Sequence, residues 1–252
     1  MGEEVSAALV IIGNEILSGR TQDINLQYIA LGLNEVGVRL TEVRVIADDE
    51  AAIIDSINSL RVRHAYVFTT GGIGPTHDDI TSECIAKAFG VPLRRDPRAV
   101  ERLLRQIKPE NLNEARLRMA NIPEGAELID NPVSHAPGFR LGNVYVMAGV
   151  PRIMQAMFDG IRPSLKGGAR MLSKSVTIFI AEGTVAAGLR DIQDRHPAVE
   201  IGSYPFVRDG SFGTVIVTRG TDAAEIGATA AEVGELARSL GARTEDDGHP
   251  PA

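Results

Sequence analysis

The sequence has one cysteine, Cys84, and no long apolar segment. A single cysteine excludes an intramolecular disulfide, which is typical of proteins in a reducing cytoplasm. The first apolar run, residues 7–12, follows an acidic stretch rather than a positively charged leader, and it is too short to span a bilayer. We therefore expect a cytoplasmic protein with no membrane partner.

A block of basic residues is also missing. The formal net charge is −7, whereas nucleic-acid-binding proteins usually present a basic face. Arginines gather between Arg94 and Arg105, but Asp96 and Glu101 interrupt them, so this stretch is expected to be a solvated helix face. No nucleic-acid partner is expected. Binding of a phosphate would depend on backbone N–H groups, a few cations or a metal.

Apolar runs alternate with helix-period stretches in the first part of the chain. Strands are predicted at residues 7–12, 39–46, 65–70 and 144–147. Helices are predicted at residues 24–37, 49–61, 80–89 and 152–165. This alternation predicts an α/β fold with three layers and a doubly wound, mostly parallel sheet. Cys84 falls on the core face of the third helix and is expected to be a packed thiol.

The Lys166-Gly167-Gly168 segment is the predicted domain boundary. Residues 1–168 would form the larger α/β domain, and residues 169–243 a smaller α+β domain in the order β-α-β-β-α. The smaller domain lacks the G-x-x-G clamp that KH modules carry between two helices, and it is acidic, so a structural or oligomerisation role is expected. Residues 244–252 are expected to be a disordered tail.

The strongest functional signal is the segment at residues 69–81, TTGGIGPTHDDIT, between a predicted strand and a predicted helix. Its glycines allow positive φ angles and close approach of the backbone, and successive N–H groups then form an anion-binding concavity. The loop follows the third strand and has no Gly-Lys-Ser/Thr, unlike the common dinucleotide and NTPase motifs. A phosphate-binding loop is predicted, with a tight structural turn as the alternative. Its predicted ligand-binding residues are Thr70, Gly71, Gly72, Gly74 and Thr76.

Acidic residues accompany this loop. Asp78 and Asp79 follow it directly, and Asp48 follows the second strand on the same carboxyl edge of the sheet, where ligands bind in open α/β folds. Carboxylates beside a phosphate cradle would repel the ligand unless a cation lay between them. Mg²⁺ is typically held by one or two carboxylates plus substrate phosphates. These three acids are therefore predicted to hold a hard, oxygen-ligated metal, and helix capping is the alternative.

Two other loops are expected to lie near the rest of the ligand. The loop after the first strand is bounded by turn glycines, and an ordinary β-α connection is its alternative interpretation. A second group surrounds the strand at residues 144–147, where His135 is expected to be a surface-loop residue. The residues predicted to bind in these loops are Gly13, Asn14, Glu15, Ser18, Gly19, Gly138, Gly149 and Pro151.

The TTGGIGPTHDDIT segment resembles the signature of the MoaB/Mog molybdopterin-binding fold. Three further segments resemble the N-terminal part of the competence/damage-inducible protein A (CinA) family: GNEILSGRTQDIN, NPVSHAPGF and AGVPRIM. The resemblance runs from about Leu9 to about Gly220. Departures occur at Ser134-His135, where Gly-Thr is usual, and at Met147-Ala148, where Leu-Pro is usual, and they leave the substrate open.

The resemblance implies a MoaB/Mog-like domain that binds a small molecule, either a pterin or a nucleotide. In CinA-type members it implies hydrolysis of ADP-ribose or related dinucleotides with Mg²⁺, Mn²⁺ or Co²⁺, with Asp48 and Asp79 matching the acids required for activity. Binding of molybdopterin without hydrolysis is the alternative. A homodimer is implied, or a trimer as in Mog-type relatives. The chain ends before the deamidase domain of full-length CinA proteins, so no deamidase activity is expected.

Overall fold

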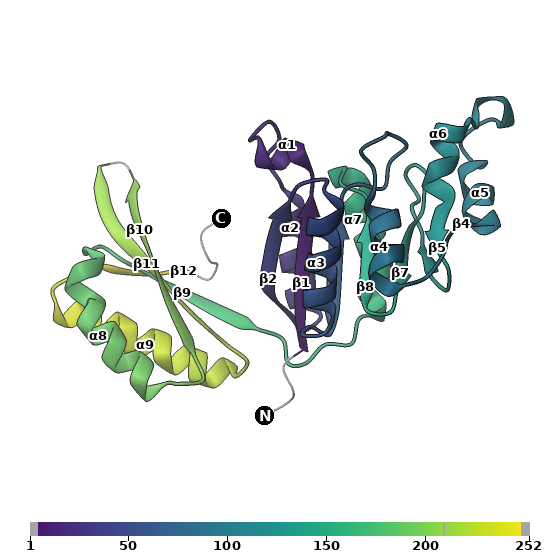
Figure 1. Cartoon of the computed structure of the whole chain (residues 1–252). Helices are drawn as coiled ribbons and strands as arrows, with labels where there is room; N and C mark the ends of the chain where they lie inside the picture. The colour runs from purple at the N-terminus through teal and green to yellow at the C-terminus, as the bar shows by residue number, and fades with distance from the viewer. Residues whose placement is uncertain (1–4, 209, 248–252) are drawn as a thin grey trace. The chain divides into compact units, whose positions relative to one another are not determined.

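The computed structural model describes residues 5–208 and 210–247. Its chain forms two compact units, residues 1–168 and residues 169–252. The secondary structure of each unit can be followed in Figure 1. No helix within the described residues is long and apolar enough to cross a membrane.

A six-stranded sheet runs through the first unit in the order β2-β1-β3-β8-β7-β6. Four of its strands are parallel: β1 (Val5–Ile12), β2 (Val38–Ile46), β3 (Tyr66–Thr70) and β8 (Val144–Met147). The side chains from Ala7 to Ile12 are at most 3% exposed, because helices cover both faces of this part of the sheet. The predicted α/β fold with a mostly parallel sheet is confirmed.

An antiparallel edge extends the sheet beyond β8. It consists of β7 (Gly138–Leu141), which pairs antiparallel with β8, and β6 (Glu127–Ile129), which pairs antiparallel with β7. The sequence analysis predicted neither strand, since segments of three or four residues are too short to show a period of two.

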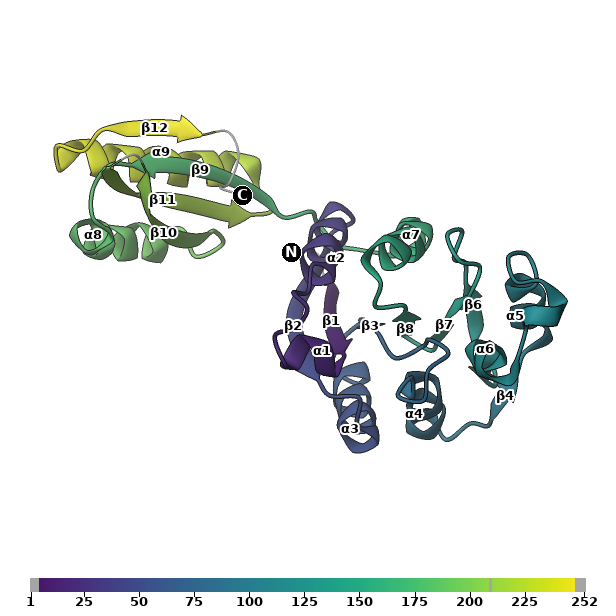
Figure 2. The same ribbon diagram turned by 90° about the horizontal axis from the view of Figure 1, so that it is seen from above.

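Two helical layers enclose the sheet, as Figure 2 shows from above. One layer contains α2 (Asn25–Glu35) and α7 (Pro151–Ile161), and the other contains α3 (Glu50–Arg61) and α4 (Thr81–Phe89). Ile53, Ile57 and Leu60 of α3 are fully buried because their spacing places them on one helical face. Cys84 of α4 is buried as predicted, and this burial raises the pKa of its thiol to about 11.

An excursion between α4 and β6 carries seven arginines. Its elements are β4 (Leu93–Arg95), α5 (Pro97–Leu103), η1 (Pro109–Asn111), α6 (Glu114–Leu117), η2 (Arg118–Ala120) and β5 (Asn121–Pro123). Carboxylates pair with five of these arginines, as Arg94–Glu124, Arg95–Glu114, Arg98–Asp96, Arg102–Asp130 and Arg105–Glu101. The residues from Arg94 to Arg105 therefore carry paired rather than unbalanced positive charge.

The second unit is an antiparallel sheet with two helices. In chain order its elements are β9 (Leu172–Ile178), α8 (Glu182–Arg195), β10 (Glu200–Arg208), β11 (Ser211–Gly220), α9 (Ala223–Ser239) and β12 (Thr244–Asp247). The strand order is β10-β11-β9-β12. A β-α-β-β-α-β chain with this order is a ferredoxin-like fold.

The prediction of a disordered tail is wrong for residues 244–247. These residues form β12, which pairs antiparallel with β9. The segment TEDD has little intrinsic preference for a strand, but the free edge of β9 supplies backbone partners that the sequence does not reveal. The remainder of the predicted tail, residues 248–252, lies outside the described residues.

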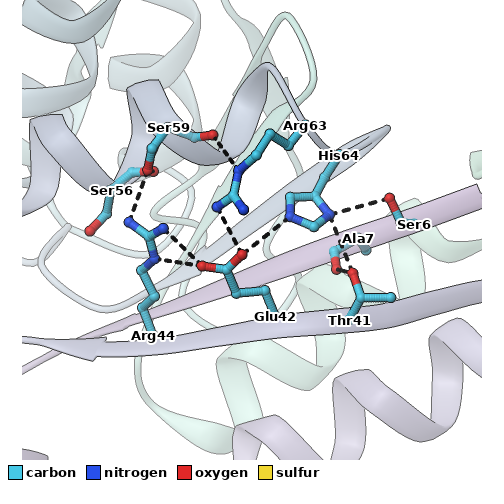
Figure 3. Close-up of polar contacts among 9 residues, drawn as sticks. All are labelled: Ser6, Ala7, Thr41, Glu42, Arg44, Ser56, Ser59, Arg63 and His64. Carbon is cyan, nitrogen blue, oxygen red and sulfur yellow. Dashed lines mark hydrogen bonds and ion pairs between the residues drawn. The ribbon is translucent and has the colours of Figure 1, made fainter.

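A polar network ties the edge strand β2 to α3 and to the start of β3 (Figure 3). The Glu42 carboxylate accepts hydrogen bonds of 2.8 Å from Nε of Arg44 and from Nη2 of Arg63. Arg44 also donates to the Ser59 hydroxyl at 2.9 Å. The hydrogen bond from Arg44, together with the charges of Arg44 and Arg63, holds the pKa of Glu42 below its ordinary value.

Replacing Glu42 by glutamine is expected to destabilise the protein by about 1 kcal/mol at neutral pH. A carboxylate whose pKa is lowered by folding stabilises the protein above its unfolded pKa, and this contribution disappears as the pH falls through the folded pKa. The wild type and E42Q should therefore differ in urea unfolding at pH 7 and converge at low pH. The control is E110Q on η1, where Glu110 has no ion pair within the described residues. A constant difference between wild type and E42Q down to low pH would contradict this role.

Candidate functional site

A cavity of about 510 Å³ lies at the carboxyl ends of the parallel strands. Its walls come from the loops that follow β1, β2, β3 and β8, together with residues 131–136 and Met119. This is the edge where open α/β sheets bind ligands, because several strand-to-helix loops converge there.

The glycine loop after β3 forms one wall of the cavity. Gly71 and Gly72 have φ angles of +104° and +68°, which residues with a side chain rarely adopt. A Cβ on Gly71 would lie 2.1 Å from the carbonyl oxygen of Ile12, so only glycine allows β3 to end this close to β1. Thr81 fixes the loop from the start of α4, since its hydroxyl donates to the Gly71 carbonyl at 3.1 Å and its N–H to the Gly72 carbonyl at 3.0 Å.

The two acids after this loop converge on one hydroxyl. Oγ1 of Thr76 lies 2.5 Å from Oδ1 of Asp78 and 2.5 Å from Oδ2 of Asp79. Asp79 also accepts the Thr76 N–H at 2.8 Å, so its carboxylate closes this turn. A hydroxyl carries a single proton and can donate to one of these oxygens only. Asp79 keeps the Thr76 N–H in either case, and the Asp78 side chain is exposed, so the geometry places two carboxylates close together at the edge of the cavity.

Asp48 approaches the cavity from the end of β2. Its Oδ2 accepts the backbone N–H of Asn14 at 2.9 Å, in the short helix α1 (Asn14–Leu17). The side chain of the neighbouring Asp49 instead caps α3, because it accepts the Ala52 N–H at 2.9 Å. Within the part of the chain that the structure describes, no three acidic, histidine or cysteine side chains form a cluster that could hold a metal by themselves.

Most of the residues predicted from sequence to bind a ligand line this cavity. They come from the four loops that follow β1, β2, β3 and β8, and they meet although up to 138 positions separate them in the chain, from Gly13 to Pro151. The predicted residues that line it are Gly13, Glu15, Asp48, Gly71, Gly72, Gly74, Thr76, Asp78, Asp79, Gly149 and Pro151.

The remaining predicted residues do not line the cavity. Thr70 is 1% exposed at the end of β3, and Gly138 lies in β7, where a Cβ would be 2.3 Å from the Val146 carbonyl oxygen. Asn14 contributes a backbone N–H to Asp48. The Ser18 hydroxyl donates to the Glu15 carbonyl at 3.2 Å, and Gly19 has a φ angle of +71° in open space. These five residues shape the loops rather than the cavity surface.

Several functional residues were missed by the sequence analysis. Asn25 at the start of α2 is 4% exposed, and its side-chain amide donates to the Gly149 carbonyl at 2.8 Å, which fixes the wall after β8. Asn131 organises the loop around itself, because its Oδ1 accepts the N–H groups of Val133 and Ser134. Asn25 is the last residue of the GNEILSGRTQDIN segment, so this motif could have indicated its role. The apolar and polar lining residues that were also missed are Ile12, Thr21, Ile73, Pro75, Met119, Asn131, Ser134, Ala136, Ala148, Val150 and Ile153.

Replacing Gly71 by alanine is expected to destabilise the protein by about 1–3 kcal/mol, because the new methyl group would be strained in φ and would meet the Ile12 carbonyl. G160A in α7 is the control, since a Cβ there has no atom within 4 Å and alanine favours a helix. Thermal unfolding of both variants measures the difference. Equal melting temperatures for G71A and G160A would show that the loop geometry does not require glycine.

The chain matches two family models. Residues 8–167 match the model described as "Probable molybdopterin binding domain", and residues 170–242 match the model described as "FAD synthase, middle domain". The two matched segments correspond to the two units of the structure.

Similar proteins occur in archaea and bacteria. A protein of Archaeoglobus fulgidus is 35% identical over 197 residues, covering 78% of this chain and 84% of that protein. A CinA-like protein of Syntrophus aciditrophicus is 35% identical over 210 residues, covering 78% of this chain and 50% of that protein, so the chain spans about half the length of this CinA-like relative. The crystal structure of CinA from Thermoplasma acidophilum, titled as of unknown function, has a TM-score of 0.61 and 33% identity, covering 64% of this chain and 98% of that chain. The chain therefore belongs to the probable molybdopterin binding domain family, as a CinA-type member with the MoaB/Mog fold.

Proposed function

We propose that this protein hydrolyses the diphosphate of a nucleotide such as ADP-ribose, with the help of a divalent cation. The observation that carries the proposal is the meeting of three acids from two loops at one cavity. Asp48 follows β2, whereas Asp78 and Asp79 follow β3, and all three line the cavity with the glycine loop. Acids placed beside a phosphate cradle are the arrangement that cation-dependent attack on a phosphoanhydride needs.

The cavity offers separate surfaces for the two ends of such a ligand. The N–H of Gly71 donates to the Met147 carbonyl at 3.1 Å, so the N–H groups of Gly72, Ile73 and Gly74, which line the cavity, are those that would bind phosphate oxygens. Ile12, Ile73 and Met119 provide apolar surface for a flat ring such as adenine or a pterin. The proposed small molecule thus combines an anionic diphosphate with an aromatic heterocycle.

The donor chemistry at the acids fits a hard divalent cation. Asp78 and Asp79 both approach the Thr76 hydroxyl, so their negative charges lie close together and a cation would offset their repulsion. Mg²⁺ requires only one or two carboxylates when phosphate oxygens complete its coordination. Asp48, Asp78 and Asp79 are the residues that would hold it. When bound, the cation would neutralise charge on the diphosphate and make a water molecule easier to deprotonate.

The residues of the chain would then direct the attack of water. The Asn14 N–H holds Oδ2 of Asp48, which leaves Oδ1 to accept a proton from the attacking water. Water adds to one phosphorus atom, the bridging P–O bond breaks, and ADP-ribose yields AMP and ribose 5-phosphate. The glycine loop would hold the charge that develops on the phosphate oxygens.

Exchanging Asp48 for asparagine is expected to lower kcat for ADP-ribose by at least about 100-fold, since asparagine can accept the Asn14 N–H but cannot take a proton. Its neighbour supplies a matched control, because D49N alters a helix cap outside the cavity and should retain wild-type kcat. D79N should also be inactive. Steady-state kinetics with circular dichroism as a fold check decides this, and a D48N variant as active as D49N would refute the assignment.

Binding of molybdopterin without hydrolysis is the second candidate function. Oδ2 of Asp79 is already engaged by the N–H and hydroxyl of Thr76, as expected for a turn-closing residue that needs no cation. The description of the matched family model agrees with a pterin ligand. The two candidates share the glycine loop and differ in their requirement for a cation.

Removal of divalent cations separates the two candidates. We expect EDTA to abolish the release of AMP from ADP-ribose, and excess Mg²⁺, Mn²⁺ or Co²⁺ to restore it, because the acids need a cation before they can accommodate a diphosphate. Chromatography of the products measures this. Pterin binding that persists in EDTA, with no hydrolysis of ADP-ribose, FAD, NAD or CoA under any of these ions, would favour the binding protein.

A further inference from the structure

The cavity is rich in carboxylates and poor in cations. Glu15, Asp48, Asp78 and Asp79 all line it, whereas its lining within the described residues includes no lysine or arginine. A divalent cation would offset only part of this negative charge. An anionic ligand would therefore gain from a further positive group that reaches the cavity from behind its lining.

Arg118 lies directly behind the acidic side of the cavity. It begins η2, and the next residue in the chain, Met119, lines the cavity. Nη2 of Arg118 donates to the backbone carbonyl of Asp79 at 3.3 Å, across 39 positions of sequence.

Arg118 differs from the other arginines of the excursion. Five of them, from Arg94 to Arg105, form ion pairs with carboxylates. Within residues 5–208 and 210–247, neither Arg116 nor Arg118 has a carboxylate side chain as an ion-pair partner. Arg116 is exposed, and its side chain donates to the Asn111 carbonyl at 2.6 Å rather than to the glycine loop. Arg118 is half-buried and bonded to the loop that carries the acids.

We propose that Arg118 is a ligand-binding residue of this cavity, whose guanidinium contacts a phosphate oxygen of the diphosphate held by the glycine loop. This inference rests on the proposed function and adds a specificity determinant to it. The single 3.3 Å bond to a neutral carbonyl is easily exchanged for a charge-assisted bond to phosphate. Guanidinium matches two phosphate oxygens at once, which favours an anionic ligand over a neutral heterocycle.

The buried neighbour Ala120 supports this assignment. Ala120 is 0% exposed and its carbonyl accepts the N–H of Asp96 at 2.8 Å, so the turn that carries Arg118 is anchored in the core. An anchored backbone with a flexible side chain places a charge near the cavity without rearranging the fold. Arg118 thus supplies from a distant segment a positive charge that the described lining of the cavity lacks.

The test compares R118Q with R116Q in the full chain. Binding of ADP-ribose with Mg²⁺ is measured by calorimetry in the D48N background, and KM and kcat are measured with Asp48 intact. We expect R118Q to raise both the dissociation constant and KM by at least about tenfold, with a much smaller change in kcat. R118K should recover part of the affinity, and R116Q should match its parent protein.

The outcomes distinguish this inference from the function on which it rests. Unchanged affinity and KM in R118Q, with hydrolysis intact, would overturn the role of Arg118 and leave the proposed function standing. A wild-type protein that neither binds nor hydrolyses ADP-ribose with any divalent ion would overturn both. If R118Q lowers the melting temperature, R118K becomes the deciding variant, because it retains the positive charge. A folded R118K that binds ADP-ribose no better than R118Q would then reject the phosphate contact.

Discussion

The close approach of the backbone at Gly71 to the Ile12 carbonyl is the constraint on which the site depends. A Cβ at Gly71 would lie 2.1 Å from that oxygen, and a Cβ at Gly149 would lie 3.2 Å from Cα of Gly71. The ends of β1, β3 and β8 can therefore meet without side chains between them. This packing makes the loops after those strands converge on one cavity, and Asn25 at the start of α2 fixes the Gly149 loop.

Electrostatics then determines what such a cavity can hold. Backbone N–H groups attract an anion, whereas Asp78 and Asp79 repel it, and their shared contact with the Thr76 hydroxyl holds the two negative charges close together. A cation would offset both repulsions, since it can contact the carboxylates and the phosphates together. The net charge of −7 shows that attraction of an anion has to be local rather than a property of the whole molecule.

The sequence predicts the parts of this arrangement that are local in the chain. Apolar runs locate the parallel strands, and strand ends locate Asp48 and the acids after the glycine loop on one edge of the sheet. Such patterns do not reveal contacts between residues that are far apart in the chain. Arg118 and Met119 belong to an excursion whose short elements give no clear periodicity, and Asn25 reaches Gly149 only after folding. For the same reason the sequence analysis did not predict β12, since the stability of this strand comes from pairing with the edge of β9.

The most direct measurement for this account is a crystal structure of the full chain with Mg²⁺ and an ADP-ribose analogue whose diphosphate has a methylene bridge. The account predicts the diphosphate on residues 71–74, the cation between it and the carboxylates of Asp48, Asp78 and Asp79, and the adenine against Ile73 or Met119. An analogue bound with its diphosphate away from the glycine loop, or a cation that contacts none of these acids, would contradict it.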